Sequence, residues 1–268
     1  MFTSRSLFAA DWWNSSTLSL KCVDDARAAV LSFFNATPDY TVVFTPNATG
    51  ALRLVGEAFP FTHKSTYILG TDAHNSVHGI REFASRQGAH VVYIPSMHQG
   101  GFDLGVAQVF FSSYLLFSVI FLNSNEQDLL YQHRPRKGDL EATNSLFAIS
   151  GQSNITNTKN PLCSIQYAAS LGYNTLLDAA ALAPSSYISL EDVPVDAMAV
   201  SFYKMFGYPT GVGALVIKKS FLEKLRRPWF AGGTVDVVQV PGDIVTMSKT
   251  HHERFEVCLL FIVSLLKD

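Results

Sequence analysis

Residues 201–211 read SFYKMFGYPTG and set one lysine, Lys204, between aromatic residues and ahead of two glycines and a proline. Lysine is normally a surface residue, yet its neighbours here have the composition of a protein interior. The residues around the stretch predict a strand that runs into a turn (196–204) and a further strand (213–219). A lysine held in apolar surroundings at a strand end can act as an amine nucleophile toward an aldehyde.

Outward from this stretch, short apolar runs alternate with segments of helical periodicity. Strands are predicted at 40–46, 65–72, 90–95, 144–150 and 174–180, and helices at 23–36, 47–59, 75–88 and 161–172. Alternation over short connections is typical of an α/β fold with a mainly parallel sheet and helices on both faces. Ligands of such sheets bind at the carboxyl ends of the strands.

Composition narrows the class of partner. The 268 residues carry a net charge of -2, which argues against a nucleic-acid partner. Cys22, Cys163 and Cys258 are far apart and match no metal-site spacing, which favours a reducing, cytoplasmic location. The apolar runs at 109–122 and 257–266 are shorter than the roughly 20 residues that span a bilayer, so we expect no membrane protein.

Polar residues follow the ends of three further predicted strands. TPNATGAL (45–52) turns into a helix whose amino end suits a phosphate, with Thr49 adding a hydroxyl. Asp178 closes the apolar strand of NTLLDAAAL (174–182) and, if buried, needs a cationic partner such as a pyridinium nitrogen. His74 follows another strand, where its ring could stack on a flat cofactor.

Each of these signals has an ordinary structural alternative. The TPNATGAL segment could be a plain helix cap, Asp178 a turn residue and His74 a structural histidine. His74 and His78 are spaced like two zinc ligands on a helix, but the glutamate of the zinc-protease motif is absent, so no metal is expected. Taken together, a lysine, an acid, a phosphate cradle and a stacking ring are what pyridoxal phosphate (PLP) chemistry requires.

The segment SFYKMFGYPTGVGALVIKK (201–219) resembles the lysine segment of eukaryotic molybdenum cofactor sulfurases, whose N-terminal domain belongs to the class V aminotransferase and cysteine desulfurase group. Further segments agree in the same order: FTPNATGALRLVGEAFPF (44–61), TDAHNSVHGIREFA (71–84), NSLFAISGQSN (144–154), NTLLDAAALAPSS (174–186) and HERFE (252–256). The resemblance implies the large domain of a fold type I PLP-dependent transferase, incomplete here.

The resemblance also implies a role for each matching residue. Lys204 is similar to the lysine that holds PLP covalently, and Asp178 to the acid that pairs with the pyridine nitrogen. His74 stands where an imidazole stacks on the ring and shuttles protons, and Asn154 where an amide lies near the phenolic oxygen. The phosphate cradle would comprise Ala48, Thr49 and Ser201. The Gly211/Gly213 turn is expected to let the backbone pack behind Lys204.

The implied activity is the transfer of sulfur from L-cysteine to the molybdenum cofactor of enzymes of the xanthine dehydrogenase and aldehyde oxidase type. These molybdenum hydroxylases would be the acceptors, and the intact family member would be a homodimer. Two alternatives remain open: another class V PLP enzyme, such as a cysteine desulfurase or lyase, and a truncated, non-catalytic remnant of the fold.

The resemblance breaks in two places. Residues 105–125 have no family counterpart, and HERFE runs into a divergent apolar tail at 257–268 instead of the expected Asp-Gly-Thr segment. We interpret both stretches as translated intron, within one partial PLP domain at 1–256 followed by the tail. No cysteine stands at the persulfide position and no substrate-binding arginine follows, so we expect this chain alone to be inactive as a sulfurase.

Overall fold

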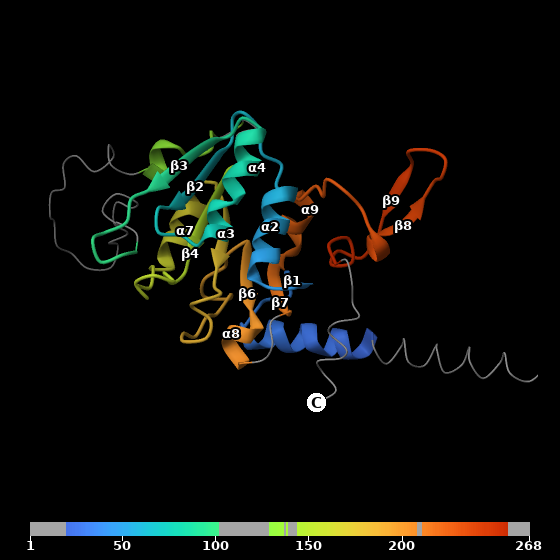
Figure 1. Ribbon diagram of the computed structural model, residues 1–268, viewed down its shortest axis with the longest axis horizontal. Helices are drawn as coiled ribbons and strands as arrows, with labels where there is room; N and C mark the ends of the chain where they lie inside the picture. Colours follow the sequence, from blue (N-terminus) through green and yellow to red (C-terminus); the bar gives the residue numbers. More distant parts are fainter. Residues whose placement is uncertain (1–19, 102–128, 137, 139–143, 208–210, 257–268) are drawn as a thin grey trace, which may run out of the picture.

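A computed structural model describes residues 20–101, 129–136, 138, 144–207 and 211–256 (Figure 1). The predicted insert at 105–125 and the predicted tail at 257–268 lie outside these residues. Within the described part, no helix is long and apolar enough to cross a membrane.

The core of the molecule is a seven-stranded sheet in the order β1-β7-β6-β5-β4-β2-β3. Its strands are β1 (Tyr40–Thr45), β2 (Thr66–Gly70), β3 (His90–Ile94), β4 (Leu146–Ser150), β5 (Asn174–Asp178), β6 (Ala197–Ser201) and β7 (Gly213–Lys218). Neighbouring strands from β3 to β6 pair in parallel, and β7 runs antiparallel to both β6 and β1. The predicted α/β class with a mainly parallel sheet is therefore confirmed.

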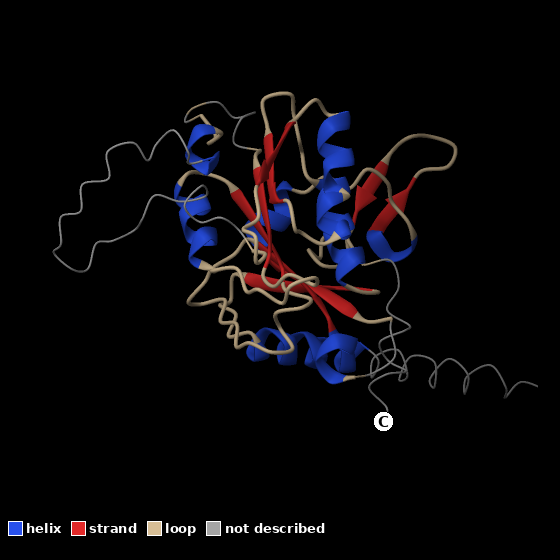
Figure 2. Ribbon diagram, turned by 60° about the vertical axis from the view of Figure 1, so that its left-hand side comes forward, coloured by secondary structure: helices blue, strands red, loops and turns tan. Residues whose placement is uncertain are grey.

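Helices cover both faces of this sheet, as predicted (Figures 1 and 2). Strand residues alternate between two apolar clusters: Ala199 and Leu215 face one, whereas Val200 and Val216 face the other. The first cluster contains α2 (Ala48–Ala58), α3 (Asn75–His78), α4 (Ile80–Arg86) and α9 (Lys219–Lys224). The second contains the helix at 20–33 and α7 (Cys163–Ser170), with the short α6 (Leu129–Gln132) beside them. Sheets buried on both faces need this continuous apolar character.

Two local predictions are wrong. The segment 75–88 is not one helix, because the helical run is interrupted at Gly79 between α3 and α4. Glycine has a low helix propensity and marks such breaks. The strand β6 ends at Ser201, and residues 202–206 form the short helix α8 (Phe202–Phe206) in place of a turn. Gly207 ends this helix in the left-handed conformation with φ 68°, a common role of glycine at helix ends.

The last described segment leaves the sheet and returns to it. After η1 (Gly232–Thr234), strands β8 (Val235–Val238) and β9 (Val245–Met247) form a hairpin that projects from the body of the molecule (Figure 1). The HERFE residues then come back to the sheet, where Glu256 makes a buried, two-pronged ion pair with Arg27 at 2.6 Å. Glu256 also accepts the Phe44 N–H, so this pair ties the first helix and β1 to the end of the described chain.

Candidate cofactor site at the carboxyl edge of the sheet

The predicted site residues come from loops that meet at one edge of the sheet. Register places Ser150 beside Asp178, and Ser201 beside Gly213. Because β7 is antiparallel, its first residue, Gly213, lies at the same edge as the last residues of β1 and β6. The carboxyl ends of β1, β4, β5 and β6 and the start of β7 therefore form a single rim.

The turn between β1 and α2 forms the first wall of the site. The Asn47 side chain caps α2 by accepting the Gly50 N–H at 2.9 Å. The Ala48 N–H donates to the Ser201 hydroxyl at 2.8 Å, which ties this turn to the end of β6. Backbone N–H groups at the start of an eleven-residue helix give this wall the character of an anion cradle.

Thr49 extends this wall toward a neighbouring helix. Its exposed hydroxyl lies 2.8 Å from that of Ser76, so the starts of α2 and α3 are joined by a hydroxyl pair. Ser76 was not among the residues predicted for the site. Its position two residues after His74 is the only signal that could have identified it.

Gly213 allows the cradle to sit where it does. A Cβ atom at this position would lie 2.6 Å from both the Asn47 Cα and the Val200 carbonyl oxygen. Any side chain here would therefore push the cradle turn away from β7. Close backbone packing was expected behind Lys204 at both Gly211 and Gly213. It occurs at Gly213, where the neighbouring backbone is that of Asn47, whereas a Cβ at Gly211 would meet nothing within 4 Å.

Asp178 is the buried acid of the site, with 6 % of its surface exposed. One carboxyl oxygen accepts the Ala180 N–H at 3.1 Å, and within the described chain the other makes no hydrogen bond. Burial raises the pKa of Asp178, while the Ala180 N–H and positive charge on His74 and Lys204 oppose that rise. The carboxylate is thus held in apolar surroundings with spare capacity for a cationic partner.

His74 is the exposed aromatic group of the site. It precedes α3 in extended conformation, and its Nδ1 accepts the Ser76 N–H at 3.2 Å. The backbone N–H of His74 donates to the hydroxyl of Ser150. Ser150 is a second residue that was not predicted for the site, although it ends an apolar strand. The bond at Nδ1 leaves Nε2 as the nitrogen that carries the proton in the neutral ring. His74 is not on a helix with His78, and the described residues contain no cluster of three potential metal ligands.

Lys204 lies on α8, directly after β6. Its helix packs on the second apolar cluster through Phe202 and Met205, but Lys204 itself is only half-buried. The prediction of a buried lysine is therefore wrong for the isolated chain, and the buried ionisable residue of the site is Asp178. Asn154 lies on the loop after β4 and is exposed, and among the described residues no hydrogen bond joins it to the other site residues.

The residues present fit a PLP molecule. The unpartnered oxygen of buried Asp178 suits a pyridinium N–H, and the start of α2 with the exposed Thr49 hydroxyl suits a phosphate. His74 and Lys204 both lie close enough to act electrostatically on Asp178, so the acid, the ring and the amine belong to one part of the sheet edge.

Comparison with known proteins identifies the family of the chain. The family model described as aminotransferase class V matches residues 14–113 and 117–257. The molybdenum cofactor sulfurase of Oryza sativa subsp. japonica is 34% identical over 257 residues, which cover 91% of this chain and 31% of the relative. That of Arabidopsis thaliana is 31% identical over 90% of this chain and 30% of its own length. The chain thus spans about a third of the length of these relatives.

Solved structures share the fold at lower sequence identity. The apo cysteine desulfurase of Thermococcus onnurineus NA1 superposes with a TM-score of 0.68 at 21% identity, covering 94% of this chain and 58% of that one. A C-DES variant with glycine covalently linked to its PLP cofactor has a TM-score of 0.66 at 20% identity, covering 94% of this chain and 62% of that one. The sheet is that of the fold type I PLP-dependent enzymes, and the cofactor implied is PLP. The chain belongs to the class V aminotransferase family.

Proposed function

We propose that this chain is the PLP-binding part of a sulfurtransferase that takes sulfur from L-cysteine and delivers it to the molybdenum cofactor. The observation that carries the proposal is the meeting of Lys204, buried Asp178 and the Ala48–Ser201 cradle at one edge of the sheet. The identity of about a third to molybdenum cofactor sulfurases supports the choice of sulfur acceptor.

Each site residue has a part in this proposal. Bound PLP supplies an electron sink for the α-carbon of an amino acid. Asp178 stays ionised against the ring nitrogen, since an opposite charge favours its carboxylate form. The cradle of Ala48, Thr49 and Ser201 holds the phosphate, and Lys204 anchors the cofactor. His74 would lie against the ring and would exchange a proton at Nε2, because the Ser76 N–H engages its Nδ1. Asn154 would turn in from its exposed loop toward the phenolic oxygen.

The partners follow from the same family relation. Molybdenum hydroxylases would be the acceptors of the sulfurated cofactor, and the intact protein would act as a homodimer in the cytoplasm. Cys22 and Cys163 are both free thiols, which fits a reducing compartment.

The test begins with the purified 268-residue chain and PLP. We expect a visible absorbance band that borohydride bleaches, and peptide mapping should then find the label on Lys204. Labelling of another lysine would contradict the site, and absence of any label would favour a non-catalytic remnant of the fold.

Deletion of the gene tests separately whether the molybdenum cofactor is the sulfur acceptor. We expect activity of the molybdenum hydroxylases to disappear and to return on chemical sulfuration of those enzymes. A cysteine desulfurase or lyase of general function would leave these enzymes active. Full hydroxylase activity without the gene would therefore overturn the assignment.

A further inference from the structure

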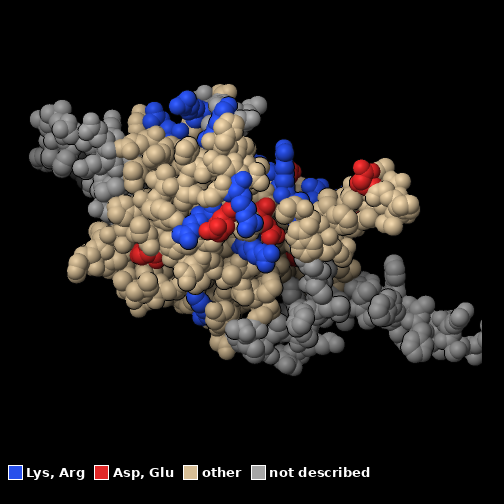
Figure 3. Space-filling view, turned by 45° about the horizontal axis from the view of Figure 1, so that its top comes forward, with Lys and Arg blue, Asp and Glu red and all other residues tan. Residues whose placement is uncertain are grey.

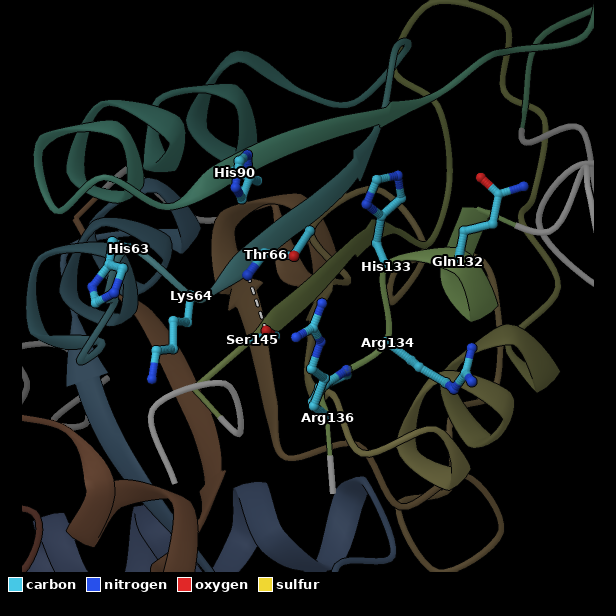
Figure 4. Close-up of a pocket in the computed structure, with 10 residues that line it drawn as sticks. His63, Lys64, Thr66, His90, Gln132, His133, Arg134, Arg136 and Ser145 are labelled. Carbon is cyan, nitrogen blue, oxygen red and sulfur yellow. Dashed lines mark hydrogen bonds between the residues drawn. The ribbon is translucent and has the colours of Figure 1, made fainter. Parts of the chain in front are cut away.

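A second concave site lies at the opposite edge of the sheet from the candidate cofactor site. It is an open cavity of about 540 Å³ beside the first residues of β2 and β3 (Figure 4). Each of these strands is five residues long, so about 16 Å of sheet separates the cavity from the carboxyl edge. None of the residues that line it takes part in the cofactor site.

Basic side chains dominate this amino-edge pocket. Its lining includes three histidines, one lysine and two arginines: His63, His90, His133, Lys64, Arg134 and Arg136. These residues come from the α2–β2 connection, the start of β3 and the segment after α6, so three separate parts of the chain bring positive charge to one place. No aspartate or glutamate is among the described residues that line it.

The two arginines are arranged differently. Arg134 is held outside the centre, since its guanidinium lies 3.7 Å from the centroid of the Tyr131 ring and donates to the Tyr131 carbonyl at 2.6 Å. Figure 4 shows it pointing away from the other labelled groups, whereas Arg136 extends toward Ser145. In the described chain, Arg136 makes no hydrogen bond or ion pair. Its planar donors thus remain available to a ligand.

The floor of the pocket is polar and fixed. Thr66 and Ser145 are both buried, and the Thr66 N–H donates to the Ser145 hydroxyl at 2.9 Å. Thr66 therefore presents its own hydroxyl from a strand that is anchored in the core. A guanidinium, imidazoles and a hydroxyl around one small space are donors that match the oxygens of a phosphate group.

The surroundings of His133 disfavour its charged form. Partial desolvation, together with the charge of His90, lowers the pKa of His133. A bound anion would reverse this effect because it favours the protonated rings. Figure 3 shows basic side chains gathered at the upper edge of the molecule, whereas basic and acidic ones are mixed at the centre of the view.

We propose that the amino-edge pocket is a binding site for a small molecule that carries a phosphate group. Its volume lies in the range of small-molecule sites, and the net charge of -2 disfavours a nucleic acid as the natural occupant. The inference does not depend on the proposed sulfurtransferase activity, because the two sites share no residue.

Calorimetry with the full chain tests the proposal, using inorganic phosphate, pyrophosphate and a mononucleotide as separate probes. We expect at least one of them to bind saturably with a dissociation constant below about 1 mM. Preference for the mononucleotide would identify an organic phosphate ester as the ligand class, and equal binding of inorganic phosphate would identify the free anion.

Variants locate the binding. Arg136→Gln should weaken it about tenfold, and His133→Gln about threefold. Arg53→Gln, which removes an exposed arginine on α2, should change nothing. Ser201→Ala alters the cofactor cradle and should leave this binding intact, which separates the two sites. Thermal unfolding checks that each variant is folded.

Three results would each overturn the proposal. One is an absence of saturable heat with all three probes. Another is equal affinity in the wild type and in folded Arg136→Gln and His133→Gln variants. The third is a single-stranded oligonucleotide that binds more tightly than any small probe, since the basic surface would then serve a polymer.

Discussion

Charged side chains are buried to different extents at the two edges of the sheet. At the carboxyl edge the acid is buried, and the cradle is locked by the 2.8 Å bond from Ala48 to Ser201 and by close packing on Gly213. At the amino edge, Arg136 and His133 are exposed. The first arrangement is preorganised for one ligand, whereas the second attracts a class of ligands through charge.

This contrast shows where geometric precision comes from in such a fold. Parallel strands deliver their last residues to one rim, where loops and helix starts converge and can bond to one another. The amino edge receives the α2–β2 connection and the segment after α6, and Arg136 there makes no hydrogen bond or ion pair within the described chain. We therefore expect point changes at the carboxyl edge to have the larger effects.

The largest effect is expected from Lys204→Ala. It should abolish covalent PLP attachment, because no other amine lies at the end of β6 in the described chain. Absorbance after PLP addition and mapping of the borohydride-labelled peptide measure this. Lys159→Ala, an exposed lysine on the loop after β4, is the matched control and should retain the label. Amino-edge anion binding should survive in both variants.

Gly213→Ala should weaken PLP binding at least tenfold and destabilise the protein by about 1–3 kcal/mol, since the new methyl would overlap the Asn47 backbone. Chemical denaturation and PLP titration give the two values. Gly233→Ala provides the comparison, because a Cβ there meets nothing within 4 Å. Equal stability of the two variants would show that the cradle does not need the close approach of the Asn47 backbone to Gly213.

Asp178→Asn should separate stability from cofactor binding. The folded-state pKa of Asp178 is raised, so its contribution to stability is present at low pH and is lost as pH rises through that pKa. At neutral pH the buried carboxylate therefore costs free energy, and the variant without PLP should be more stable on the order of 1 kcal/mol. PLP binding should nevertheless weaken, because Asn cannot pair with a pyridinium.

Unfolding measured from pH 4 to pH 8 checks the sign of this effect. The gap between Asp178→Asn and the wild type should widen as pH rises. A variant that is less stable at every pH would mean that the carboxylate has a structural role that the amide cannot fill.

The smallest expected effect is the pH dependence of anion binding at the amino edge. Sulfate is the probe, because its charge stays constant over this range. The pKa of His133 is lowered in the empty pocket and a bound anion would raise it, so sulfate affinity should rise by a few-fold as pH falls from 8 to 5. The charged and titratable groups that line the pocket together with this ring are His63, Lys64, His90, Arg134 and Arg136.

His133→Gln should remove part of this rise in sulfate affinity. If the double variant with His90→Gln loses what remains of the rise, that part belongs to His90. An affinity for sulfate that does not vary between pH 5 and pH 8 would show that the pocket works through its arginines and lysine, without the histidines.

Much of the fold could be predicted from local patterns. The strand at 40–45, the helix after it and the buried strands ending at Ser150 and Asp178 follow from apolar periodicity, which is a property of neighbouring residues. The interruption at Gly79 and the helix α8 were missed, because boundaries depend on how a segment packs as well as on its composition.

The candidate site was predictable as a set of residues because strand ends of a parallel sheet share an edge. Family resemblance added the roles of residues such as Asn154, whose exposed loop carries no local signal. Ser76 and Ser150 were missed, since their importance lies in bonds to Thr49 and His74.

By itself, the sequence determined the fold class, the order of the elements and the chemistry available at the carboxyl edge. Only the tertiary structure decided that Asp178 is buried while Lys204 is half-buried, that Gly213 accommodates the backbone of Asn47, and that distant basic residues share the amino-edge pocket. The physical reason is range: periodicity and propensity act over a few residues, whereas burial and charge clustering depend on contacts between segments that are distant in the chain.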